Sequence, residues 1–391
     1  MSLVSHLECA RCGKQFETGK VYNVCPCGSP LLVRYRLSRE AGNNLLNSLP
    51  LRAPDLWRYR EVLPVTQDSS IVSLGEGFTS LLHTERLGAR LGLANLYLKN
   101  EAMNPTGSFK DRGMAVAVSM ARELGITRIA APSAGNAAGA LAAYAAKAGM
   151  KATVFMPSDT PLANRLECSL SGAEVVLIDG SIKDCGRALR ERTPAEGFFD
   201  VSTLREPYRV EGKKTMAYEV YEQLGWRLPD AMIYPAGGGT GLIGMWKAFD
   251  EMAELGWVDE RRPRMFAVQS TGCAPMVRAF VRHSEEAEEW RDPVTIASGL
   301  RVPSAIGDFL ILRALYQSHG AALAVEDATM LEAVRELAET EGLITSPEGG
   351  ATLAALKRLV ADGILTGAET IVLFLTATGY KYLEVLQKLA D

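Results

Sequence analysis

The chain has 391 residues, of which 47% are hydrophobic and 36 are glycines, and its formal net charge is −4. This length exceeds what a single core accommodates, so we expect two large units and a small one, with a composition typical of an α/β enzyme. The weakly acidic balance excludes the electrostatic surface that nucleic acid or an anionic membrane requires, and no apolar run reaches the roughly twenty residues of a membrane span.

The cysteines and the N-terminus bear on the cellular compartment. Charged residues and cysteines stand at the N-terminus, where a secretory signal would carry an apolar stretch. The total of seven cysteines is odd, and Cys168, Cys185 and Cys273 are widely scattered along the chain. Scattered thiols are typical of a reducing compartment. We therefore expect a cytoplasmic enzyme that acts on a small molecule, with no nucleic-acid or membrane partner.

Residues 1–36 carry the other four cysteines, Cys9, Cys12, Cys25 and Cys27. The first pair has C-x-x-C spacing and the second pair is C-x-C, one residue short of the usual knuckle. Two close pairs of this kind resemble a zinc ribbon, in which four thiolates leave no open position for chemistry, so any zinc would be structural. The alternative is a degenerate ribbon that folds without metal on the apolar residues that follow it (Leu31, Leu32, Val33 and Tyr35).

Strands and helices alternate through most of the remaining chain. Residues 37–70 indicate a helical connection, and the acidic run 285–289 indicates a short solvated helix face. The predicted strands are 95–99, 128–131, 152–156, 174–178, 231–234, 264–269 and 370–375. Such alternation predicts parallel sheets with helices on both faces and an active site at the carboxyl ends of the strands.

Lys110 is the principal candidate for a catalytic residue. It follows the turn 105–107 and begins the small apolar run 113–118, which predicts a buried helix. An amine held at the start of a buried helix loses hydration, so its pKa falls and it can attack a carbonyl as a neutral nucleophile. The natural carbonyl partner is pyridoxal phosphate, bound to the lysine as a Schiff base.

Three further motifs follow in order. Ser133 to Asn136 stand at a turn between a predicted strand and an Ala-rich helix, where Asn136 either contacts a cofactor or caps the helix. The glycine-rich turn that follows the strand 231–234 suits a phosphate at a helix N-terminus (Gly237, Gly238, Gly239, Thr240 and Gly241). Thr376 ends the last strand and can accommodate an unprotonated pyridine nitrogen. Each motif alone is unspecific, but the ordered set indicates a pyridoxal phosphate enzyme.

The whole chain resembles the threonine synthases, which are fold-type II pyridoxal phosphate enzymes related to the tryptophan synthase β subunit and to serine/threonine dehydratases. The matching segments are Leu74 to Gly77 with Thr79, Pro105 to Arg112, Ser133 to Asn136, Pro207 to Thr215, Gly237 to Gly241, and Leu375 and Thr376 with Gly379 to Lys381.

The resemblance implies two doubly wound parallel-sheet domains with the active site between them, after the zinc-ribbon-like segment. Residues 37–112 and 209–391 would form the large cofactor domain, and residues 113–208 a small mobile one, in a homodimer. Lys110 would be the Schiff-base lysine, Asn136 would meet the ring hydroxyl oxygen, residues 237–241 the phosphate and Thr376 the ring nitrogen.

The resemblance also implies a reaction, in which O-phosphohomoserine and water give threonine and phosphate. Ser133, Arg209, Lys213 and Lys381 are then the predicted substrate-binding residues. Lys110, once released by the substrate amine, would act as the general base that removes the α proton.

The chain departs from the family pattern where that phosphate is held. Ala137 replaces a threonine, and Leu204 and Glu206 stand in a segment that commonly reads Asn-Ser-x-Asn-Pro-Tyr-Arg. Glu206 would repel a phosphate if it faced the same pocket. The alternative is therefore a serine/threonine dehydratase or another β-elimination or β-replacement enzyme on a small amino acid. A catalytically idle regulator is disfavoured because Lys110 and the cofactor motifs are retained.

Overall fold

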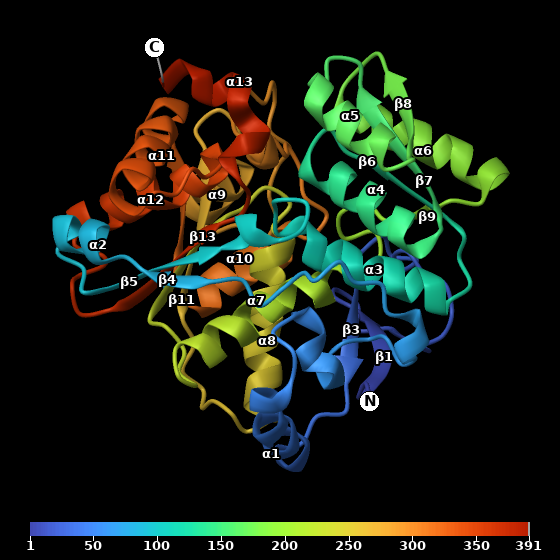
Figure 1. The fold of residues 1–391 in the computed structure, drawn as a ribbon, viewed down its shortest axis with the longest axis horizontal. Helices are drawn as coiled ribbons and strands as arrows, with labels where there is room; N and C mark the ends of the chain where they lie inside the picture. Colours follow the sequence, from blue (N-terminus) through green and yellow to red (C-terminus); the bar gives the residue numbers. More distant parts are fainter. Residues whose placement is uncertain (390–391) are drawn as a thin grey trace.

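The computed structural model describes residues 1–389 as three β-sheets with helices packed around them (Figure 1). Two of the sheets are parallel throughout or nearly so, and the third is a small antiparallel sheet at the N-terminus. Within these residues, no helix combines the length and apolar character that crossing a membrane requires.

The N-terminal sheet contains the cysteine segment. Its strands, in the order β2-β1-β3, are β1 Val4–Cys9, β2 Gln15–Phe16 and β3 Leu31–Tyr35. It rests on the rest of the protein through specific polar contacts: Asn23 Nδ2 donates to the carbonyls of Asp200 and Arg205, at 2.8 Å each, and Tyr35 Oη donates to Glu211 at 2.7 Å. Helix α1 Arg39–Ser48 follows, capped by the Ser38 hydroxyl, which accepts from Ala41 N.

The largest sheet has six strands in the order β12-β11-β10-β13-β5-β4, and only β4 is antiparallel. These strands are β4 Leu81–His83, β5 Asn95–Asn100, β10 Ala231–Pro235, β11 Arg264–Ser270, β12 Ala321–Val325 and β13 Thr370–Leu375. The helices around it are α2 Glu85–Leu91, α7 Arg209–Gln223, α8 Thr240–Glu254, α9 Pro275–Val281, α10 Asp308–Gln317, α11 Asp327–Glu341, α12 Pro347–Ala361 and α13 Leu383–Leu386.

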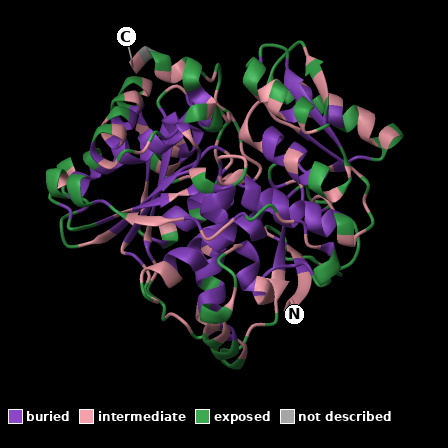
Figure 2. Ribbon diagram, in the orientation of Figure 1, coloured by how far each residue is buried: buried purple, intermediate pink, exposed green. Residues whose placement is uncertain are grey.

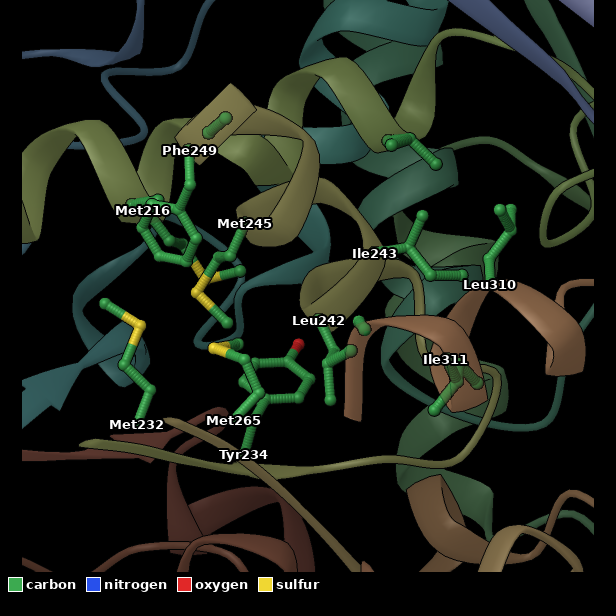
Figure 3. Packing of buried hydrophobic residues seen from close by; sticks show 14 of the residues in the cluster. Met216, Met232, Tyr234, Leu242, Ile243, Met245, Phe249, Met265, Leu310 and Ile311 are labelled. Atoms are coloured by element: carbon green, nitrogen blue, oxygen red, sulfur yellow. The ribbon is translucent and has the colours of Figure 1, made fainter. Parts of the chain in front are cut away.

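Both faces of this sheet are covered, because alternate residues of each central strand point to opposite sides. Figure 3 shows one face, where Met232 and Tyr234 of β10 and Met265 of β11 pack against residues of three helices (Met216 of α7, Met245 and Phe249 of α8, and Leu310 and Ile311 of α10). Ile233 and Phe266, on the other face, belong to a second core with residues of α11 and α12. The six-stranded sheet is therefore doubly wound, as expected.

The four-stranded sheet has the order β8-β7-β6-β9 and is fully parallel. Its strands are β6 Arg128–Pro132, β7 Lys151–Pro157, β8 Glu174–Ile178 and β9 Phe199–Asp200, and its helices are α3 Lys110–Glu123, α4 Asn136–Ala148, α5 Leu162–Leu170 and α6 Ile182–Glu196. Figure 2 shows α3 and α7 largely buried at the centre of the molecule, whereas α5 and α6 expose their outer faces. Short 3-10 helices complete the chain (Leu49–Leu51, Leu56–Val62, Asp68–Ser70, Glu101–Met103, Ser298–Leu300, Gly379–Tyr382 and Gln387–Leu389).

All seven predicted strands are present, but the prediction of a helix at 285–289 is wrong. Residues 285–289 form bends and irregular backbone. Arg278 Nη2 donates to the carbonyls of Glu288 and Glu289, and Ala287 N donates to Asp308 Oδ2. Backbone groups that a helix would have paired internally are thus bound by side chains from elsewhere.

Candidate active site

A cleft of about 1880 Å³ opens between the six-stranded and the four-stranded sheets. Its walls come from the carboxyl ends of β6, β10 and β13, from the start of α3, and from the loop that precedes α10. Carboxyl ends of parallel strands are the usual place for a ligand in such folds. Lys110, Ser133, Asn136, residues 237–240 and Thr376 all line this cleft, although they are far apart in the sequence.

Lys110 is the first residue of α3, and the preceding turn fixes its position. The turn is attached to the end of β13, because Phe109 N donates to Thr376 O at 3.0 Å and Thr378 N donates to Gly107 O at 2.9 Å. Gly107 has φ +73°, which favours glycine at this position. The sequence-level expectation of a buried helix is confirmed, and it brings the lysine next to Thr376.

The environment of Lys110 favours its neutral form. Burial, and then the positive charge of Arg209, lower the pKa of Lys110 to about 7, against the opposing charge of Glu348. Its Nζ also lies 4.3 Å from the centre of the Phe109 ring. A large share of the amine is therefore unprotonated near neutral pH, which is the form that attacks a carbonyl.

The start of α3 is also held by a group of buried charged side chains that do not line the cleft. The Arg112 guanidinium donates to Glu101 through Nε at 2.6 Å and Nη2 at 2.7 Å, and to Glu219 through Nη1 at 2.5 Å. Lys99 Nζ donates to the other oxygen of Glu219 at 2.7 Å. The side chains of Arg112, Glu101, Glu219 and Lys99 are all fully buried. We call these four residues the Arg112 cluster.

Asn136 does not cap its helix. Gly135 is the N-cap residue of α4 and no side chain caps it, whereas Asn136 Nδ2 donates to Tyr382 Oη at 3.2 Å. Ser133 lies in the turn before it, where its Oγ accepts from Gly135 N at 3.4 Å. The Asn136 amide is thus directed into the cleft, as a cofactor contact requires.

The glycine-rich turn forms a tight backbone cradle at the start of α8. Gly239 is the N-cap residue, with φ +68°, and the first free N–H groups of the helix lie behind it. A Cβ on Gly237 would overlap Gly299 O, one on Gly239 would overlap Ile311, and one on Gly241 would overlap Tyr234 Oη. The turn therefore requires glycines at these positions, and its N–H groups suit an anion such as a phosphate.

Lys213 lies at this cradle and not among the residues that line the cleft. Its Nζ donates to Thr240 Oγ1 at 2.6 Å. Burial lowers the pKa of Lys213 well below its usual value, and the charges of Lys110 and Arg209 lower it further. The expectation that Lys213 reaches the substrate is therefore not supported by its position, which instead suits the phosphate cradle.

Arg209, the first residue of α7, is fully buried and lines the cleft. Its Nη1 donates to Val201 O at 2.7 Å, but its Nε and Nη2 have no partner among residues 1–389. Buried guanidinium donors without an acceptor are costly, and they favour an anionic ligand that can bind two of them at once.

Glu206 and Lys381 do not line the cleft. The Glu206 carboxylate accepts from the N–H groups of Tyr208 at 2.7 Å and Arg209 at 3.1 Å, at the start of α7, and it does not line the cleft. The condition under which Glu206 would repel a phosphate, that it faces the same pocket, is therefore not met by its position. Lys381 is bound to Glu167 at 2.7 Å and lies outside the cleft lining as well.

The sequence did not single out Ser298, Glu348 and Tyr382, which also line the cleft. Tyr382 Oη donates to Glu348 Oε1 at 3.0 Å and lies 3.4 Å from Ser298 Oγ. The only sequence signal for Glu348 is the helix-start pattern Ser346-Pro347, in which the Ser346 hydroxyl accepts from Gly349 N.

The four N-terminal cysteines converge despite the short second pair. Their sulfur atoms all lie within 4.8 Å of one another, with 3.5 Å between Cys9 and Cys27, 3.7 Å between Cys12 and Cys25, and 3.8 Å between Cys12 and Cys27. The turn after Cys27 is completed by Gly28, with φ +84°. The neighbouring Leu31 and Val33 are buried, so the segment has both a sulfur cluster and a small apolar core.

Comparison with known proteins agrees with this geometry. Residues 72–377 match the family described as "Pyridoxal-phosphate dependent enzyme". The chain is 36% identical to a threonine synthase of Methanocaldococcus jannaschii over 95% of this chain and 92% of that protein, and 34% identical to one of Methanosarcina acetivorans over 95% and 91%.

Solved structures share the fold at lower identity. Threonine deaminase isoform 2 of Solanum lycopersicum superposes with a TM-score of 0.69 at 20% identity, covering 95% of this chain and 99% of that one. An L-serine ammonia-lyase of Rhizomucor miehei gives a TM-score of 0.68 at 24% identity, covering 79% and 97%. On the strength of the family match and the extended sequence identity, the chain belongs to the pyridoxal-phosphate-dependent enzyme family, among the threonine synthases.

Proposed function

We propose that this lyase converts O-phosphohomoserine and water to threonine and phosphate. The observation that carries the proposal is the pair of Arg209 donors that find no acceptor in the described part of the chain and lie in the same cleft as Lys110. An anionic group on the substrate would satisfy them, and its departure as phosphate would release them again.

The residues of the cleft fit pyridoxal phosphate. Lys110 would hold its carbonyl carbon, Asn136 its ring hydroxyl, the turn 237–241 with Lys213 its phosphate, and Thr376 the ring nitrogen side. The fit rests on a lysine with a lowered pKa and on a glycine cradle that a Cβ would fill. When bound, the cofactor withdraws electrons from the α carbon of an amino acid.

Different side chains of the cleft would then have different roles in the reaction. Lys110 would take the α proton as general base. A second proton has to leave the β carbon before the phosphate departs from the γ carbon. A proton then adds at the γ carbon and water at the β carbon, and Lys110 would return a proton to the α carbon. Arg209 holds the substrate phosphate with two parallel hydrogen bonds, and Ser133 with the start of α4 receives the carboxylate.

A dehydratase acting on threonine or serine is the second candidate. Ala137 is the observation that favours it, because it lines the cleft and provides no hydroxyl for a phosphate. The test is to incubate the purified enzyme separately with O-phosphohomoserine, threonine and serine. Phosphate and threonine released in equal amounts would support our proposal, whereas 2-oxobutyrate formed from threonine without phosphohomoserine turnover would establish the dehydratase.

We also propose one structural zinc ion on Cys9, Cys12, Cys25 and Cys27. Zinc–sulfur bonds of about 2.3 Å in a tetrahedron place neighbouring sulfurs about 3.8 Å apart, close to the separations of 3.5, 3.7 and 3.8 Å between these thiols. Metal analysis of protein purified without chelator should give about one zinc per chain. Metal-free protein of unchanged stability would favour the degenerate ribbon instead.

The division of the chain and its assembly remain part of the proposal. Residues 113–208 would move as a small domain against 37–112 and 209–391, since β6 to β9 lie within that range and the strands of the six-stranded sheet lie outside it. A cytoplasmic location is supported by the three scattered free cysteines, Cys168, Cys185 and Cys273. A homodimer is supported by exposed apolar side chains at Ile344, Tyr380 and Leu383. Light scattering of the wild type and of Tyr380→Asp would test the dimer.

A further inference from the structure

Lys381 does not line the cleft, but it forms an ion pair between elements of the two parallel sheets. Its Nζ donates to both carboxylate oxygens of Glu167, at 2.7 and 2.9 Å. Glu167 lies on α5, beside the four-stranded sheet, whereas Lys381 lies in the 3-10 helix Gly379–Tyr382, which follows the last strand of the six-stranded sheet. The side chains of Lys381 and Glu167 are 17% and 25% exposed, so water screens the pair only in part.

The ion pair depends on the glycine at position 139. Gly139 lies in α4, which is otherwise rich in alanine. Glycine within a helix is destabilising relative to alanine, so its presence here calls for a specific reason. A Cβ on Gly139 would overlap the carboxyl group of Glu167. Gly139 therefore leaves the space through which this carboxylate reaches Lys381.

Helix α5 also holds the turn that carries Asn136. On α5, Asn164 Nδ2 donates to Ala134 O at 2.7 Å. On the other side of the turn, Asn136 Nδ2 donates to Tyr382 Oη at 3.2 Å. Tyr382 directly follows Lys381 in the 3-10 helix. The 3-10 helix, α5 and the turn are thus joined in a closed loop of three contacts.

The 3-10 helix is itself attached to the wall of the cleft that carries Lys110. Thr378 N, directly before this helix, donates to Gly107 O at 2.9 Å. A Cβ on Gly107 would come too close to the Thr378 methyl group, so the two segments pack tightly. Because Gly107 belongs to the turn that precedes Lys110, the closed loop of contacts fixes the turn 133–136 relative to that lysine.

We propose that the Glu167–Lys381 ion pair positions Asn136, because it holds α5, and through α5 the turn 133–136, against the wall that carries Lys110. The inference rests on the proposed function, which places the cofactor between Lys110 and Asn136. Lys381 then serves the site without touching the substrate. Breaking the ion pair would loosen the turn and weaken the cofactor contact of Asn136, while the rest of the fold keeps its own contacts.

The test compares the amide hydrogen exchange of residues 133–139 between variants of the cofactor-free protein. Gly139→Ala keeps both charges but displaces the Glu167 carboxylate, and Lys381→Met removes the cation. Each should lower the protection of this segment about 2- to 5-fold, as expected for the loss of a partly exposed ion pair. Each should also raise the dissociation constant of pyridoxal phosphate by a similar factor. Gly186→Ala, on α6, is the matched control, because the nearest atom to a Cβ there is the flexible end of Arg190, at 3.3 Å.

Two further measurements separate positioning from a general contribution to stability. Alanine favours a helix, so Gly139→Ala should not lower the midpoint of urea unfolding, although residues 133–139 exchange faster. Because both variants break the same ion pair, the double variant should exchange no faster than either single variant.

The outcomes also separate this inference from the proposed reaction. Unchanged protection in Gly139→Ala, or effects that multiply in the double variant, would overturn the inference. Faster exchange with unchanged cofactor affinity would overturn it as well, because Asn136 would then not depend on the ion pair for its contact. Absence of phosphohomoserine turnover would contradict the proposed reaction and leave the exchange results unchanged.

Discussion

Two buried arginines illustrate how the interior separates structural from functional charge. Arg112 is paired with two carboxylates, and its three nitrogen atoms all donate hydrogen bonds within the Arg112 cluster. Arg209 is equally buried but uses one nitrogen, and its other two have no partner among the described residues. A satisfied charge holds the fold together, whereas an unsatisfied charge at a cleft indicates a ligand.

The largest effect should come from removing the amine of Lys110. Lys110→Ala should abolish the visible absorption band of the lysine-bound cofactor and reduce turnover by at least the roughly 10²–10⁴-fold attributed to a general base. Borohydride followed by mass spectrometry should label wild-type enzyme at this lysine. Label at Lys213 or at another lysine would contradict the assignment.

On the structural side of the comparison, Arg112→Met should destabilise the fold. It leaves Glu101 and Glu219 buried with less compensation, at a cost of about 3–5 kcal/mol in the free energy of unfolding. Urea unfolding of the cofactor-free protein measures this cost. A variant as stable as the wild type would show that the Arg112 cluster does not hold the fold.

Arg209→Met should have the opposite effect to Arg112→Met: it should reduce activity and leave stability largely unchanged. The loss of a charge-assisted contact to the substrate should cost about 1.5–3 kcal/mol, or roughly 10- to 150-fold in kcat/KM for phosphohomoserine. The stability of the cofactor-free protein should not fall by a similar amount, because two of the three nitrogens have no partner within residues 1–389. Arg313→Met, on the exposed face of α10, is the matched control. If Arg209→Met lost stability and activity together, Arg209 would be a structural charge like Arg112, and the distinction between the two arginines would be wrong.

Substitution of Glu206 should give the smallest effect. Its charge is neither paired with another charged side chain, as that of Arg112 is, nor left without partners, as two of the Arg209 nitrogens are, because it accepts from backbone N–H groups. Burial raises the pKa of Glu206 to about 7 from an ordinary value of 4.5. The folded chain therefore binds more protons than the unfolded chain between those values, so stability falls as the pH rises from 5 to 7. Glu206→Gln should reduce this slope in urea unfolding at pH 5 and 8, and leave KM unchanged. A large fall in KM would return Glu206 to the substrate pocket.

Much of the fold was accessible from the sequence, because the strands of parallel sheets are apolar runs bounded by glycine turns. The strand β12 was not predicted, since Ala321 to Val325 is a short, alanine-rich apolar run whose pattern does not distinguish strand from helix. Lys110, Asn136 and the 237–241 turn could be found because each lies at a strand-to-helix turn with a distinctive local sequence.

The remaining residues of the site depend on long-range contacts. Glu206 and Arg209 are three positions apart, yet one faces a helix terminus and the other the cleft, which a sequence pattern does not resolve. Tyr382 and Glu348 reach Asn136 only after β13, α12 and α4 have met. Such contacts follow from tertiary packing and leave no spacing rule in the sequence.

The contacts made by the N-terminal ribbon bear on how the protein unfolds. Asn23 holds two carbonyls of the 200–205 segment, and Tyr35 donates to Glu211, which in turn accepts from Lys214 at 2.6 Å. The ribbon thus contributes to a buried charge network on α7, the helix that begins with Arg209. Unfolding of the ribbon would expose that network to water. We therefore expect the N-terminal sheet and the part of the protein that contains α7 to unfold in one cooperative transition and not as two independent units.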